Sequence, residues 1–116
     1  MTDHEDWRGP LTAPEREEYT SRMDALRDEI DRLDEVLVRL LNARAGCALK
    51  IGALKKRLTM EIYQPSREEA VLKHVRDVNA GPLDSDAIAR LFERIIDEAR
   101  RLERVVQERE SNIDPT

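Results

Sequence analysis

The sequence has a single cysteine, Cys47, and only two histidines, His4 and His74. One cysteine allows neither an intrachain disulfide bond nor a metal site built from several cysteines. The two histidines lie far apart without a partner at the spacing of zinc ligands, so we expect no metal site. Aromatic residues make up only 3% of the chain, and β-branched residues are sparse. This composition disfavours a β-sheet and favours helices rich in Leu, Ala, Arg and Glu.

The sequence also lacks a long apolar segment. No apolar run approaches the length of a membrane-spanning helix, and residues 1–6 are acidic where a signal peptide would be basic and then apolar. We therefore expect a cytoplasmic protein. Its 116 residues, of which 40% are hydrophobic, suffice for one compact domain. We expect this domain to span residues 12–110, between a flexible N-terminal tail (1–11) and a frayed C-terminus (111–116).

An excess of positive charge is absent as well. The formal net charge is −5, although 39% of the residues are charged. A nucleic-acid-binding protein needs a cationic face that displaces counterions, so we expect no nucleic-acid partner. The lack of a long apolar run argues against a membrane partner. A small anionic substrate is compatible with this charge, because a few inward-pointing cations can dominate the potential of a pocket.

The apolar residues predict an all-α protein with a very long first helix. A capping-box pattern with proline in the first turn begins at Thr12, and Thr20 or Ser21 offers a second start. Apolar residues then recur at intervals of three and four up to Leu58. A helix of roughly 40 residues is about 60 Å long, whereas a compact chain of this size has a radius of gyration of ~13 Å. The chain cannot cover such a helix alone, so we expect a homodimer.

Two shorter helices are predicted after a linker at residues 59–64. The second helix spans about residues 66–78 and is ended by a Gly-Pro turn. The third spans about residues 85–109, and Asp84 or Ser85 caps it. The predicted buried residues of these two helices are Val71, Leu72, Val75, Val78, Ile88, Leu91, Phe92, Ile95, Ile96, Ala99, Leu102 and Val106.

Two cations of the first helix share one face. Arg44 and Lys55 are eleven residues apart, which is three turns and about 20° of rotation. Ala48 and Ile51 lie between them on the same face. The spacing therefore predicts an apolar floor with a positive charge at each end.

Two further cations can reach the same floor. Arg67 opens the second helix and can fold back from the linker towards it. Arg27 precedes Arg44 by seventeen residues, about 100° away round the helix, so only an antiparallel partner helix could present it there. The alternative is that all four are surface cations paired with acidic neighbours, as most Lys and Arg residues are. The acidic neighbours in question are Asp31, Glu35 and Glu68.

Glu103 is an acidic residue on an apolar stripe of the third helix. Residues at helical intervals form this stripe, which consists of Phe92, Ile96, Ala99, Glu103 and Val106. A carboxyl group in such a place either pairs with a cation or keeps its proton. Alternatively, the helix is solvated at this point and Glu103 pairs with Arg100 or Arg104.

Five segments have an order and spacing that carry a resemblance. They are LRDEIDRLD at 26–34, LLNAR at 40–44, IGALK at 51–55, PSRE at 65–68 and LFERII at 91–96. Each segment alone is weakly specific, but five in this order over one short chain are specific. Over about residues 22–107 the sequence resembles the all-helical class of chorismate mutases.

The resemblance implies an intertwined homodimer in which the long first helices pair antiparallel. It also implies the rearrangement of chorismate to prephenate in aromatic amino-acid biosynthesis, without a cofactor. That reaction passes through a compact pericyclic transition state and needs no nucleophile or metal. A protein can supply a folded substrate conformation and hydrogen-bond donors at the ether oxygen, where negative charge develops.

The resemblance assigns a role to each candidate residue. Arg44 and the partner's copy of Arg27 would hold carboxylates, because Arg binds them in bidentate geometry. Lys55 would donate to the ether oxygen and orient a carboxylate, and Arg67 would orient the substrate from the linker end. Glu68 would bind the substrate hydroxyl group. Glu103 would act with Lys55 and Arg44 in catalysis, and the remaining substrate contacts implied are Gln64, Ile51, Val71, Ile96 and Ala99.

Three residues depart from the family pattern. Many members have Gln where this chain has Glu103, and Glu donates a hydrogen bond only when it is protonated. We expect a protonated Glu103 in the site and a rate that falls as Glu103 ionises. Gln64 replaces a common acidic residue and Ala99 replaces a small hydroxyl residue, so two substrate contacts are lost.

Other functions are compatible with parts of this pattern. Isochorismate pyruvate lyases resemble the same pattern and use similar cations. A regulatory or binding partner of a shikimate-pathway enzyme would also be a helical dimer, but the presence of all four cations argues against an inactive scaffold. A coiled-coil adaptor would explain the long helix, but it would not explain cations beside Ala48 and Ile51.

Overall fold

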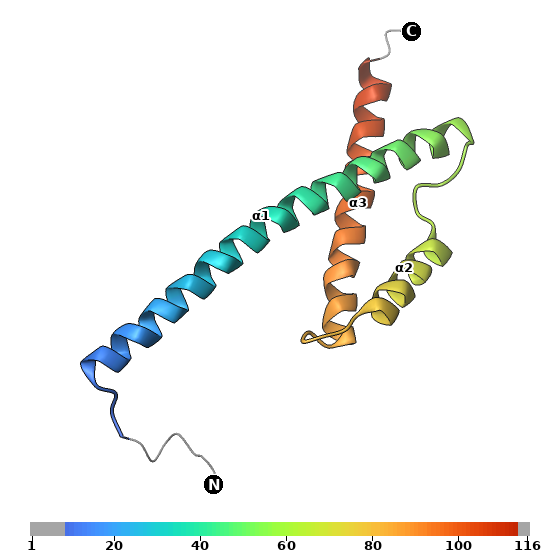
Figure 1. The fold of residues 1–116 in the computed structure, drawn as a ribbon. Coiled ribbons are helices and arrows are strands. Elements are labelled where there is room, and N and C mark those ends of the chain that lie inside the picture. Colours follow the sequence, from blue (N-terminus) through green and yellow to red (C-terminus); the bar gives the residue numbers. More distant parts are fainter. Residues whose placement is uncertain (1–8, 114–116) are drawn as a thin grey trace. The chain divides into compact units, whose positions relative to one another are not determined.

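The computed structural model describes residues 9–113, which form three helices (Figure 1). These are α1 (Ala13–Arg57), α2 (Pro65–Val78) and α3 (Ser85–Ile113). Residues 9–113 contain no strand, so the all-α prediction is confirmed. Within this range no helix is long and apolar enough to cross a membrane. His4, most of the predicted tail and residues 114–116 of the predicted frayed C-terminus lie outside the described residues.

The capping box at Thr12 sets the start of α1. The backbone N–H of Glu15 donates to Thr12 Oγ1 (3.2 Å), and the N–H of Thr12 donates to Glu15 Oε1 (2.8 Å). These reciprocal bonds satisfy two of the N–H groups that a helix start leaves unpaired. Of the two predicted starts, the earlier one is correct, and α1 is 45 residues long.

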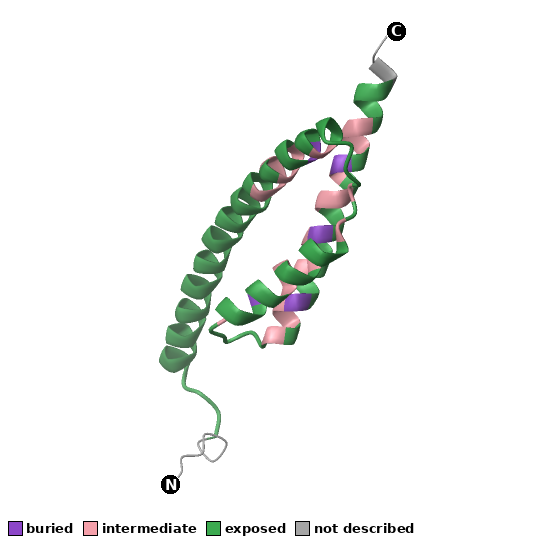
Figure 2. Cartoon of the chain, turned by 90° about the vertical axis from the view of Figure 1, so that its right-hand side faces the viewer, coloured by how far each residue is buried: buried purple, intermediate pink, exposed green. Residues whose placement is uncertain are grey.

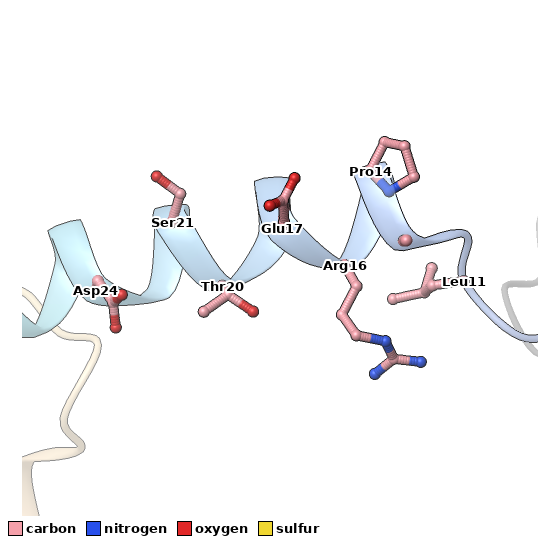
Figure 3. Close-up of a pocket in the computed structure, with 8 residues that line it drawn as sticks. Leu11, Pro14, Arg16, Glu17, Thr20, Ser21 and Asp24 are labelled. Carbon is pink, nitrogen blue, oxygen red and sulfur yellow. The ribbon is translucent and has the colours of Figure 1, made fainter.

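The chain divides into two units between Arg39 and Leu40, and the first unit contains the N-terminal part of α1. Every described residue of this unit is exposed (Figure 2). Its apolar positions include Leu26, Ile30 and Leu33, each more than half exposed. A hollow of about 860 Å³ at the start of α1 is lined only by exposed residues from the segment 11–24 (Figure 3). This hollow is a shallow depression on the surface at the N-terminal end of α1.

The core lies in the second unit, where α2 packs against α3. Ala89, Ile96 and Glu103 of α3 are buried at intervals of seven residues, and Val75 of α2 is buried with them. Two predictions of burial are wrong for the single chain, since Val78 is 63% and Leu91 is 54% exposed. Val78 is the last residue of α2, and Leu91 precedes the buried Ile96 by five positions, which places it on another face of α3.

Specific turns place the short helices. At the end of α1 the N–H of Met60 donates to Lys55 O and the N–H of Thr59 donates to Lys56 O. This is a Schellman motif with Thr59 in the left-handed region (φ 57°), where a β-branched residue is uncommon. At the start of α3 the N–H of Ala87 donates to Asp84 Oδ1 (2.7 Å), so Asp84 is the cap.

Candidate functional site

A cavity of about 440 Å³ lies within the second unit. The C-terminal part of α1, the linker, the first turns of α2 and the middle of α3 contribute its walls. This volume falls in the range of small-molecule sites. Its lining residues are Arg44, Cys47, Ala48, Ile51, Lys55, Met60, Ile62, Gln64, Arg67, Glu68, Val71, Ile96, Ala99, Arg100 and Glu103.

The structure brings every predicted site residue to this cavity except Arg27. Arg27 belongs to the first unit, where its side chain is exposed. Sequence reasoning missed Met60 and Ile62, which belong to the linker and carry no periodic signal. It also missed Arg100 as a cavity residue, although Arg100 follows Ile96 by four positions, an interval that could have revealed it.

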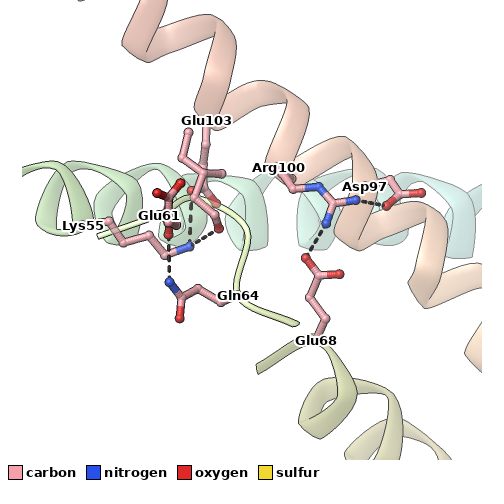
Figure 4. A network of polar contacts seen from close by, with 8 residues as sticks. Lys55, Glu61, Gln64, Glu68, Asp97, Arg100 and Glu103 are labelled. Atoms are coloured by element: carbon pink, nitrogen blue, oxygen red, sulfur yellow. Dashed lines mark hydrogen bonds and ion pairs between the residues drawn. The ribbon is translucent and has the colours of Figure 1, made fainter. Parts of the chain in front are cut away.

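Lys55 is held at one end of the cavity by two oxygen groups. Its Nζ donates to Ile62 O at 2.9 Å and lies 3.6 Å from Glu103 Oε2 (Figure 4). The Lys55 side chain is only 15% exposed. The Schellman turn after α1 returns the chain so that the linker carbonyl faces this ammonium group. An ammonium has three N–H donors. The bond to Ile62 O uses one of them, and the contact with Glu103 at 3.6 Å is an ion pair beyond hydrogen-bond distance, so two donors remain for a ligand.

Glu103 is buried in the single chain, with a relative exposure of 7%. Its pairing with Lys55 across the cavity excludes the alternative in which it pairs with Arg100 or Arg104 at a solvated surface. Among the described residues, Glu103 Oε2 has no hydrogen-bond partner. Gly52 makes room for this side chain, because a Cβ atom at Gly52 would lie 3.2 Å from Glu103 Cγ and 3.3 Å from Oε2.

Glu68 lies near the start of α2 and binds a cation that was not predicted as its partner. Arg100 Nη1 donates to Glu68 Oε2 at 2.6 Å, and Arg100 Nη2 donates to Asp97 Oδ1 at 2.7 Å (Figure 4). The guanidinium group also lies over the ring of Tyr63, 4.9 Å from its centroid. Arg100 is therefore fixed on three sides.

The remaining cations of the cavity are less constrained. The guanidinium of Arg44 lies 5.9 Å from the centroid of the Phe92 ring, and its side chain is partly buried. Arg67 is exposed and forms no ion pair with any residue in the range 9–113. Neither Arg44 nor Arg67 therefore fits the alternative of a surface cation that is paired with an acidic neighbour.

The cavity is cationic although the chain is acidic. Its lining includes four cations and two carboxylates, which gives a net formal charge of +2. Apolar side chains such as Ile51, Val71 and Ile96 form the rest of the walls. Within the described part of the chain, no group of three His, Cys, Asp or Glu residues could hold a metal ion. Such a cavity suits a small, compact dianion with an apolar body.

Two solved chorismate mutase structures are similar to this chain. The form II structure of chorismate mutase from Thermus thermophilus has a TM-score of 0.70 and 36% identity, and the match covers 72% of this chain and 94% of that one. A chorismate mutase from Helicobacter pylori, crystallised with prephenate, has a TM-score of 0.70 and 30% identity. That match covers 76% of this chain and 96% of the other.

The curated relatives are longer proteins. A bifunctional chorismate mutase/prephenate dehydratase of Neisseria gonorrhoeae is 45% identical over 78 residues, which are 67% of this chain and 21% of the relative. The protein of the same description from Pseudomonas aeruginosa is 41% identical over 87 residues, 71% of this chain and 24% of the relative. This chain thus spans between a fifth and a quarter of the length of these relatives.

The family model for chorismate mutase type II matches residues 26–104. With more than half of its length matched, this chain belongs to the chorismate mutase type II family.

Proposed function

We propose that this chain rearranges chorismate to prephenate without a cofactor. The observation that carries the proposal is the cationic, apolar-walled cavity, in which Lys55 faces inward between Ile62 O and Glu103. Chorismate has two carboxylates, an apolar ring and an ether bond that breaks during the rearrangement. The net charge and the walls of the cavity match these features.

The proposed mechanism is electrostatic. Arg44 binds a substrate carboxylate, and Arg67 orients the substrate from the start of α2. One of the remaining N–H groups of Lys55 donates to the ether oxygen as the C–O bond breaks and negative charge develops there. A preorganised ammonium in a partly buried site stabilises that charge more than water does. Glu68 accepts a hydrogen bond from the substrate hydroxyl, and Glu103 contacts the ether side when it is protonated.

We further propose that the active species is a homodimer in which each subunit contributes its Arg27 to the cavity of the other subunit. The cavity has no contribution from Arg27 of the first unit, and the apolar positions around Arg27 on α1 are exposed. An exposed apolar stripe of this kind is covered by association. The antiparallel pairing of α1 with a second copy would bury the stripe and present Arg27 to the partner's cavity. A cytoplasmic location and an enzyme partner in the same pathway stay predictions.

Loss of chorismate absorbance with purified protein tests the function. We expect conversion to prephenate, and a decrease of at least about 100-fold in kcat/KM for Arg44→Ala, because a carboxylate contact in a desolvated site is removed. Circular dichroism of the variant controls for folding. A folded wild-type protein that leaves chorismate unchanged would contradict the proposal. Release of pyruvate from isochorismate would then identify a lyase, and activity only with an added pathway enzyme would identify a regulatory partner.

A further inference from the structure

Arg100 is the cavity cation whose partners are most fully defined. Both ends of its guanidinium fork are occupied, one by Glu68 and one by Asp97, at 2.6 and 2.7 Å. The Tyr63 ring lies against the guanidinium at 4.9 Å. The side chains of Arg100 and Glu68 are only 21% and 25% exposed. This pair is therefore more buried than the surface ion pairs whose contribution to stability is close to zero.

These contacts argue against Arg100 as a ligand of a substrate carboxylate. A guanidinium group binds a carboxylate best through two parallel N–H donors, and here one N–H of each Nη atom is already engaged by a protein carboxylate. The contacts instead act on Glu68. One of its oxygens, Oε2, is fixed by Arg100, and within residues 9–113 the other oxygen, Oε1, has no hydrogen-bond partner.

The charge of Glu68 also needs compensation in a site for a dianion. A carboxylate lining such a cavity repels the substrate unless a cation lies beside it. Arg100 supplies that cation, and without it the net formal charge of the lining residues falls from +2 to +1.

We propose that Arg100 is a positioning residue for Glu68: it binds Glu68 Oε2 and neutralises the carboxylate, so that Oε1 is presented to the hydroxyl group of the substrate. This inference rests on the proposed function. Asp97 and the ring of Tyr63 hold the guanidinium in place and thereby fix the direction of Oε1. Because the hydroxyl group does not take part in bond breaking, the contact binds ground state and transition state alike. Its loss therefore raises KM more than it lowers kcat.

A double-mutant cycle of Arg100→Ala and Glu68→Ala tests this role. In the otherwise wild-type chain, we expect Arg100→Ala to raise KM for chorismate about tenfold and to change kcat less than about threefold. In the Glu68→Ala background the same substitution should change KM less than about twofold, because its target is absent. Arg100→Lys should restore most of the affinity, since a single ammonium can still bind Glu68 Oε2.

Lys73→Ala is the matched control, since it removes an ion pair of 2.8 Å on the exposed face of α2 and should leave KM unchanged. Thermal melts of all variants separate a loss of folding from a loss of affinity. Equal losses of affinity in both backgrounds would overturn the inference and assign Arg100 to the substrate itself. A lower melting temperature with unchanged KM would also overturn it, in favour of a structural pair. No turnover by the folded wild-type chain would overturn the proposed function, and this inference with it.

Discussion

At the scale of single residues, Lys55 and Glu103 show how a buried acid can lie in an anion-binding cavity. The carboxylate is 3.6 Å from the ammonium, close enough for attraction, and Glu103 Oε2 accepts no hydrogen bond from a residue in the described range. Without a substrate the two groups compensate each other. When an ether oxygen is bound near Lys55, a protonated Glu103 can donate to it, whereas an ionised Glu103 repels the developing charge.

Glu103→Gln and Glu103→Ala should therefore differ in turnover. The amide of Gln can donate a hydrogen bond to the ether oxygen, whereas the methyl group of Ala cannot. We expect Glu103→Gln to keep most of the activity and Glu103→Ala to lower kcat/KM at least about tenfold, because a hydrogen bond to the developing charge is lost. The measurement is kcat/KM for chorismate with both variants, and circular dichroism controls for folding. Equal losses in the two variants would show that a hydrogen bond from this position does not assist the reaction.

The candidate residues were predictable to different degrees. Arg44, Lys55 and Glu103 follow from helical spacing, because a helix determines which side chains share a face. The partner of Glu68 was not predictable, since the contact joins residues 32 positions apart on α2 and α3. Met60 and Ile62 line the cavity only because the turn after α1 folds the linker back, and linker residues have no periodicity.

At the scale of elements, α1 contains two glycines with different surroundings. A Cβ atom at Gly46 would meet nothing within 4 Å, whereas one at Gly52 would touch Glu103. In a helix interior alanine is favoured over glycine by about 1 kcal/mol. Propensity alone would therefore make both positions alanine, and only Gly52 has a packing reason to remain glycine.

Gly52→Ala should separate stability from activity. The gain in helix propensity of about 1 kcal/mol opposes the cost of displacing Glu103 by a few tenths of an ångström, so the free energy of unfolding should change by less than about 1 kcal/mol. We expect kcat/KM to fall about tenfold, because Glu103 moves relative to Lys55. Urea unfolding and chorismate turnover measure the two effects. Gly46→Ala is the control, which should be stabilised with unchanged turnover, and full activity of Gly52→Ala would contradict the packing argument.

The helix boundaries were largely predictable, whereas burial was not. The capping residues Thr12 and Asp84 mark the starts of α1 and α3 in the sequence. Each side chain accepts a hydrogen bond from the backbone N–H three residues later. Apolar character predicted burial at Val78 and Leu91, which are exposed in the single chain. Burial depends on which neighbour covers a face, and a helical pattern does not contain that information.

At the scale of the whole molecule, the proposed exchange of Arg27 makes each site depend on two subunits. Arg27→Ala and Arg44→Ala should each be nearly inactive as homodimers. When equal amounts are refolded together, half of the dimers are mixed, and each mixed dimer has one site with both cations and one with neither. We expect about a quarter of wild-type activity to return.

The control mixture combines Arg44→Ala with Lys55→Ala, which both belong to the cavity of one subunit. Every site in that mixture lacks one of the two cations, so no activity should return. Differently tagged chains establish by mass spectrometry that mixed dimers have formed. Mixed dimers of Arg27→Ala and Arg44→Ala that stay inactive would refute the shared site.

The proposed dimer is held together through the exposed apolar side chains between positions 23 and 37 of α1. The rate of the proposed enzyme should therefore depend on protein concentration. Below the dissociation constant of the dimer, each chain keeps its cavity but has no second chain to supply Arg27. The concentration of complete sites then grows with the square of total protein, so halving the amount of enzyme reduces the rate about fourfold. Expression level alone would then tune the flux through the reaction steeply, without an effector.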